Sequence, residues 1–254
     1  MKAFFGELRR RNSLLYYFGW LCLLGALVCA VAIQFTDIIV LGINAFIKPM
    51  KFFVSICILC WTMAWYTYYL QQPRKTFAYS VAIVIVFTYE MFAIIWQAAN
   101  RRLSHFNFDT PTYGVVFALM GIAIIVFTFW TAYIGFLFFI KRDFNLPASY
   151  VWGIRIGIIL FLVFTFEGGM MTERLAHTVG APDGGPGLPV VNWSRQHGDL
   201  RVAHFVGMHA LQIIPLFGYF VTRKLAMVFL FSFGYLILAT ALLLQALNKT
   251  PLFS

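Results

Sequence analysis

The chain has 254 residues, of which 61% are hydrophobic and only 11% are charged, against about 25% charged residues in an ordinary soluble domain. So few polar residues could not cover the apolar surface, which excludes a soluble protein. The net charge of +10 comes from short basic clusters at the ends of apolar runs. Nucleic-acid binding requires a continuous basic stripe instead, so we expect no nucleic-acid partner.

Apolar runs long enough to cross a bilayer recur along the whole chain. Backbone groups in lipid must be bonded within the chain, which favours helices, and the alternation typical of a membrane β-barrel is missing. We therefore predict an all-α polytopic membrane protein, a seven-transmembrane helix bundle forming a single membrane domain over residues 1–254. The predicted helices cover residues 13–34, 50–70, 76–99, 113–140, 151–175, 201–221 and 225–247.

The first apolar run follows three arginines, Arg9, Arg10 and Arg11. It is too long for the core of a signal peptide, and no convincing cleavage site follows it, so we interpret it as an uncleaved first span. The four cysteines all lie in predicted helices, where packing is the simplest interpretation of their role.

The distribution of lysine and arginine predicts the orientation. With the N-terminus inside the cell, eleven of these residues lie on the inner side and eight on the outer side. We therefore predict an N-in/C-out arrangement. In either orientation, all five histidines fall on one side, near the outer surface in the preferred arrangement.

Helical spacing gathers the polar residues of four spans into stripes. In the third span, Glu90, Gln97 and Arg101 fall within about 40° at 100° per residue. The fifth span carries Glu167 and Arg174, with His177 just beyond, and Gly168 and Gly169 beside Glu167 permit a kink or close helix approach. The sixth span carries Arg201, His204, His209 and Gln212, and the second begins its stripe at Lys51.

Charge facing lipid is costly, so we expect these stripes to face a common pocket in the outer half of the bundle. The outer loop of residues 178–199 alternates glycine with proline, which is typical of defined turns, and would cover this pocket. It adds Asp183, Trp193 and Asp199 to the site, and the preceding outer loop adds His105.

Histidine beside carboxylate suits a transition metal or haem, and intramembrane carboxylates usually mark function. The predicted catalytic residues are Glu90, Glu167, His204 and His209. The predicted metal ligands are Glu167, His177, His204 and His209. The predicted substrate-binding residues are Lys51, Gln97, Arg101, His105, Arg174, Asp183, Trp193, Asp199, Arg201 and Gln212.

Each of these residues also has a structural interpretation. Glu167 and Arg174 can form an ion pair, Glu90 can bond Lys51 or a tyrosine, and His204 and His209 can bond nearby backbone. His204 and His209 are five positions apart, or roughly 140° around a helix, which is poor spacing for chelating one ion together.

Three stretches together, INAFIKPMKF, SHFN, and HTVGAPDGGPGLP followed by GDLRVAHFVGMHALQ, resemble an uncharacterised family of bacterial multi-pass inner-membrane proteins. The resemblance covers about Gly42 to Pro215 and implies a bacterial inner-membrane location, without an activity to transfer. The arrangement also resembles the membrane metal-hydrolase superfamily that includes alkaline ceramidases, but the last span lacks an HxxxH, so no residue is carried across.

A site opening on one side favours a metal- or haem-dependent membrane enzyme or redox protein acting on a lipophilic or outer-face substrate. A proton- or ion-coupled transporter is the first alternative, and a membrane sensor, receptor or assembly factor is the second. The bilayer is the expected partner, together with a lipophilic small molecule.

Overall fold

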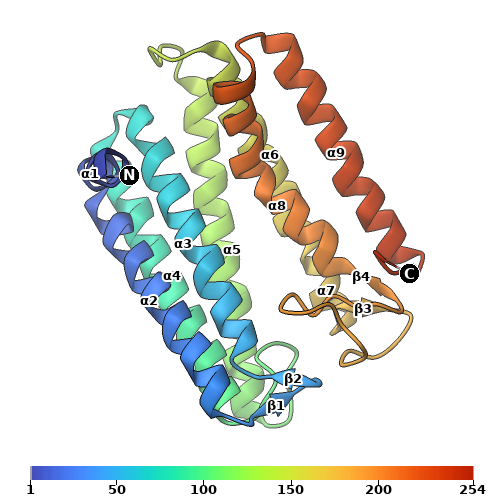
Figure 1. Ribbon diagram of the computed structural model, residues 1–254. Coiled ribbons are helices and arrows are strands. Elements are labelled where there is room, and N and C mark those ends of the chain that lie inside the picture. The colour runs from blue at the N-terminus through green and yellow to red at the C-terminus, as the bar shows by residue number, and fades with distance from the viewer. Residues whose placement is uncertain (1, 254) are drawn as a thin grey trace. The chain divides into compact units, whose positions relative to one another are not determined.

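The fold is all-helical apart from two short strand pairs, in a computed structural model that describes residues 2–253 (Figure 1). Its elements are α1 (Lys2–Arg11), α2 (Ser13–Phe35), β1 (Ile39–Val40), β2 (Ile43–Asn44), α3 (Ile47–Thr67), η1 (Tyr68–Leu70), α4 (Pro73–Ala99), α5 (Pro111–Ile140), α6 (Ala148–Glu167), α7 (Gly169–Arg174), β3 (Thr178–Val179), β4 (Gly198–Asp199), α8 (Leu200–Leu216), η2 (Phe217–Val221) and α9 (Leu225–Leu247).

Within residues 2–253, seven helical segments are long and apolar enough to cross a membrane, which confirms the predicted number of spans. Their ends differ from the predicted ends by three residues at most, and the differences lie mainly at the N-terminal ends. Pro73 and Pro111 are the first residues of α4 and α5. Proline is tolerated in the first helical turn, because the amide hydrogen it lacks would have no helical partner there.

The chain folds as two compact units that meet within α5, the first ending at Trp130 and the second beginning at Thr131. Each unit has its own packed helices. The single membrane domain therefore remains a prediction.

In the first unit, α2 and α3 pack closely because glycines of α2 face large rings of α3. A side chain at Gly19 would overlap the ring of Trp61, and one at Gly25 would lie 2.5 Å from Phe53. At the start of α2, Asn12 caps the helix by accepting a hydrogen bond from the amide of Leu15, and its amide group donates to Ser80 of α4 over 2.8 Å. These contacts connect the first three long helices.

In the second unit, α6 and α8 form the closest helix pair, again through small residues. A side chain at Gly157 would lie 2.9 Å from the backbone oxygen of Ala210, and one at Gly207 would overlap the ring of Phe164. On the other side of α8, Tyr235 of α9 donates to the carbonyl of Val206 over 2.6 Å. Pro215 removes one hydrogen-bond donor near the end of α8, and the chain continues as the π-helical turn η2.

Helices α5 and α9 bury least, since only 22% of the most apolar stretch of each is buried. Neither helix carries a charged residue.

Candidate functional site

The second unit joins a carboxylate and a histidine from two helices that pack against each other. Glu167 is the last residue of α6, and His204 lies one turn into α8. Nδ1 of His204 lies 2.7 Å from the carbonyl oxygen of Phe164 and 3.2 Å from Oε2 of Glu167. Glu167 thus pairs with His204 on the neighbouring helix α8, and not with Arg174 at the end of α7.

Gly168 makes this contact possible, because it ends α6 directly beneath the imidazole. A Cβ atom built at Gly168 would lie 2.6 Å from Cε1 and 3.0 Å from Nδ1 of His204. The helix breaks there and resumes as α7 at Gly169, whose added Cβ would meet nothing within 4 Å. Of the two adjacent glycines, only Gly168 is therefore required by close approach.

The hydrogen bonds of His204 determine what its ring can do. A backbone carbonyl only accepts hydrogen bonds, so in the neutral ring Nδ1 carries the proton and Nε2 keeps its lone pair. Nε2 has no partner among the described residues, and the side chain is 28% exposed. A histidine held in this way is the usual arrangement of a metal ligand or of a base oriented by a carboxylate.

His209 lies further along α8, among aromatic rings. Its ring centroid is 4.3 Å from that of Phe205, which in turn lies 5.6 Å from that of Trp193 in the loop before α8. Nδ1 of His209 lies 3.2 Å from Oε1 of Gln212. The row of three rings connects the loop to the exposed side of α8.

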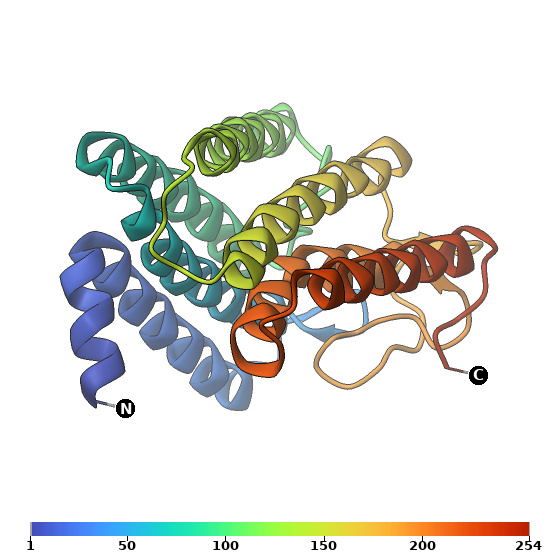
Figure 2. The same ribbon diagram turned by 90° about the horizontal axis from the view of Figure 1, so that it is seen from above.

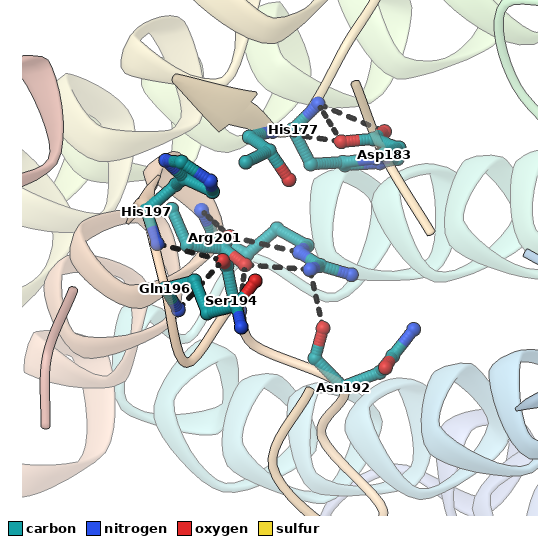
Figure 3. A network of polar contacts seen from close by, with 9 residues as sticks. His177, Asp183, Asn192, Ser194, Gln196, His197 and Arg201 are labelled. Atoms are coloured by element: carbon teal, nitrogen blue, oxygen red, sulfur yellow. Dashed lines mark hydrogen bonds and ion pairs between the residues drawn. The ribbon is translucent and has the colours of Figure 1, made fainter. Parts of the chain in front are cut away.

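An ion pair connects the end of the loop to the first turn of α8 (Figure 3). Asp199 is the N-cap residue of α8, and its carboxylate is almost completely buried. It accepts hydrogen bonds from the amide of Ser194 and from both the amide and the guanidinium of Arg201. Arg201 also donates to the carbonyl of Asn192. The charged groups of Asp199 and Arg201 therefore both hold the loop in place.

A second pair closes the beginning of the same loop, also shown in Figure 3. The carboxylate of Asp183 lies 2.6 Å from Nδ1 of His177 and accepts hydrogen bonds from the amides of His177 and Thr178. Burial by itself raises the pKa of Asp183, but the hydrogen bonds and charge of His177 outweigh it. The pKa of Asp183 is therefore well below its usual range.

Short strand pairs also order this loop, which the sequence predicted only as a set of turns. Thr178 pairs with Asp199 and Val179 with Gly198, in antiparallel register. Gly187 and Ser194 form an isolated bridge, and Ser194 accepts hydrogen bonds from the amides of Gln196 and His197. The two ends of the loop are thereby held beside the start of α8.

The polar residues of the first unit hold its own loop. Gln97 is fully buried, donates to the carbonyls of Ala93 and Ser104, and accepts from Asn107. His105 contacts the hydroxyl of Ser104 over 3.0 Å. These contacts indicate that Gln97 orders the turn after α4.

Glu90 is the exception in this unit, because it is buried in α4 without a hydrogen-bond partner for Oε1 among the described residues. Oε1 of Glu167 is in the same state in the second unit. The expected bond from Glu90 to Lys51 stays a prediction, and Lys51 lies half-buried near the start of α3. Arg101 and Arg174 are both exposed, Arg101 with a left-handed backbone.

The four predicted metal ligands do not come together as one site. Glu167 pairs with His204, His177 pairs with Asp183, and His209 contacts Gln212. Across residues 2–253, no group of three or more histidine, cysteine or acidic side chains is placed to hold a metal ion. The prediction of a metal held by several of these side chains is therefore unsupported, because helix packing separates them into pairs.

Glu90 belongs to the first unit, whereas Glu167, His204 and His209 belong to the second. The pocket shared by all four residues stays a prediction. The geometry described for the second unit supports a smaller site, which consists of the Glu167–His204 pair and the ordered loop at the start of α8.

Comparison of the chain with protein-family models, curated proteins and solved structures found no match. Function must therefore be argued from the geometry.

Sequence reasoning missed three participants: the carbonyl oxygens of Phe164 and Asn192, and the ring of Phe205. A carbonyl has no signature in the sequence, because every residue carries one. Phe205 had a usable signal, since it lies four residues before His209 on the same helical face.

Proposed function

We propose that this chain is a multi-pass membrane protein of redox or metal-dependent chemistry, in which Nε2 of His204 binds the metal of a prosthetic group such as haem. The observation that carries the proposal is the pair of contacts at Nδ1, to the carbonyl of Phe164 and to Glu167. Such contacts select the tautomer, orient the ring and raise the basicity of the other nitrogen.

Haem fits this arrangement better than a chelated ion does. A chelated zinc ion requires three or four protein ligands, and the described residues offer no such group. Haem iron can be held by one axial histidine, and the porphyrin supplies the other nitrogens.

We further propose a bacterial inner-membrane location with the N-terminus inside and the ordered loop outside. The excess of lysine and arginine on the N-terminal side supports this orientation. The site would then act on a lipophilic or outer-face substrate.

The test is an absorption spectrum and a metal analysis of the protein purified in detergent from its native membranes. We expect a haem band, or about one transition metal per chain, that is lost in His204→Ala. His197→Ala is the matched control, because the described hydrogen bond of His197 is made by its backbone amide and survives the substitution. Wild-type protein that is colourless and free of metal, or unchanged content in His204→Ala, would reject the proposal.

A proton-coupled transporter is the second candidate, favoured by the unpartnered buried carboxyl oxygens of Glu90 and Glu167. Carboxyl groups inside the membrane recur in proton pathways. A hydrophobic carbodiimide, which reacts with protonated carboxyl groups in lipid, should then modify Glu90, with Glu90→Gln as the unreactive control. Proton uptake that is unaffected by this reagent and by Glu90→Gln would exclude this candidate.

A further inference from the structure

Helix α1 lies across the ends of the long helices of the first unit, an arrangement that the sequence did not predict. Helix α1 is seen end-on in Figure 1, in which α2, α3 and α4 are seen from the side. In Figure 2, α1 is seen from the side. Its ten residues span about 15 Å. A short helix at the ends of spanning helices lies at the level of the lipid headgroups.

One face of α1 packs on aromatic side chains of α2 and α3. Leu8 is completely buried, and the ring of Phe5 lies 5.3 Å from the rings of both Trp20 and Trp61. The ring of Phe4 stacks on Trp65, also at 5.3 Å. Tryptophan gathers at membrane interfaces, so these contacts place α1 at the boundary between lipid and water.

Arg11 fastens the end of α1 to the same aromatic group. Its guanidinium carbon lies 3.8 Å from the ring centre of Trp65, with Tyr68 and Tyr69 within 5 Å, and the group donates to the carbonyl of Trp65. Glu7 accepts hydrogen bonds from Arg10 and Arg11, which lower the pKa of Glu7 to about 2. Glu7 therefore stays ionised at any physiological pH.

Basic residues outnumber acidic ones in α1 and in the first turn of α4. The sequence places six basic residues in α1 and the first turn of α4, namely Lys2, Arg9, Arg10, Arg11, Arg74 and Lys75. Glu7 is the one acidic residue in these two segments, and its carboxylate already forms ion pairs with Arg10 and Arg11. Arg9 and Arg74 are exposed and have no anionic partner among the described residues.

We propose that α1 and the start of α4 form a binding surface for the headgroup of an anionic phospholipid, in which Arg9 and Arg74 are the cations without an anionic partner. The phosphate group of such a lipid lies at the depth where the aromatic contacts hold α1, and arginine is well suited to bind phosphate. This inference does not depend on the function proposed for His204.

The experiment measures lipid retention by the full-length protein. Purified protein is equilibrated with equal amounts of phosphatidylglycerol and phosphatidylcholine with identical chains, and retained lipids are counted by native mass spectrometry. We expect the wild type to prefer phosphatidylglycerol, and Arg9→Gln with Arg74→Gln to lower that preference by about fivefold per residue removed. This variant keeps the contacts of Glu7 with Arg10 and Arg11.

The matched control is Arg101→Gln with Arg195→Gln, which removes the same charge from two exposed arginines elsewhere in the chain. Retention that is equal for both lipids in the wild type, or lowered equally by the two double variants, overturns the proposal. If the first variant does not fold, raising the salt concentration with wild-type protein decides the question. The preference should fall as salt screens the charges, and a preference independent of salt overturns the proposal.

Discussion

His204 owes its position to residues that lie 36 to 40 positions earlier in the chain. The carbonyl of Phe164 and the carboxylate of Glu167 hold one ring nitrogen, and the missing side chain of Gly168 leaves space for the ring. Oε1 of Glu90 and Oε1 of Glu167 both lack a hydrogen-bond partner among the described residues. Glu167 differs in that its other carboxylate oxygen, Oε2, contacts His204.

Replacing Gly168 tests this arrangement. Gly168→Ala places a methyl group against the imidazole, so we expect a loss of about 1–3 kcal/mol in the free energy of unfolding. Gly169→Ala adds the same atoms in open space, and within a helix it should be neutral or stabilise by up to about 1 kcal/mol. Denaturant titration of both variants in detergent measures the difference. Equal stability of the two variants would contradict the described position of His204.

Among the elements, the loop between α7 and α8 has more internal structure than its glycine and proline content suggests. Antiparallel pairs join its ends. The carboxylates of Asp183 and Asp199 accept hydrogen bonds from its amides and pair with His177 and Arg201. Such a loop is ordered and is not a flexible linker, since its backbone groups are bonded internally.

Asp183→Asn should destabilise this loop in a pH-dependent way. The pKa of Asp183 is lowered in the folded protein, so its stabilisation is fully present above the unfolded value of about 3.9 and is lost as pH falls towards the folded value. We expect Asp183→Asn to cost about 1.5–3 kcal/mol at pH 7 and progressively less below about pH 4.

Thermal unfolding in detergent between pH 3 and pH 7 checks this expectation. Asp109→Asn is the control, because its exposed bridge to Arg102 should contribute about 0–1 kcal/mol. A difference between wild type and Asp183→Asn that grows towards acid pH would show that the sign of the linkage is wrong.

For the whole molecule, the seven apolar helices make a multi-pass membrane protein, while the orientation rests on the charge bias alone. Two exposed loop positions can test this orientation. Gln196 lies exposed in the loop before α8, and Arg142 lies exposed between α5 and α6.

The predicted topology places these two positions on opposite sides. In intact cells, a membrane-impermeant maleimide should label Gln196→Cys and leave Arg142→Cys unlabelled until the cells are opened. The four native cysteines are buried, so the background should be low. Labelling with the opposite pattern would invert the proposed orientation.

The sequence alone determined the seven helices and the side chains that interrupt them, because the cost of placing a residue in lipid belongs largely to that residue and its helical period. It could not determine that Glu167 pairs with His204 and not with Arg174, that Asp199 and Arg201 hold a loop, or that α1 lies across the helix ends. Those outcomes depend on how closely particular helices approach and on which backbone carbonyls they expose. Only tertiary structure decides them, since a contact is a property of two segments and a hydropathy pattern is a property of one.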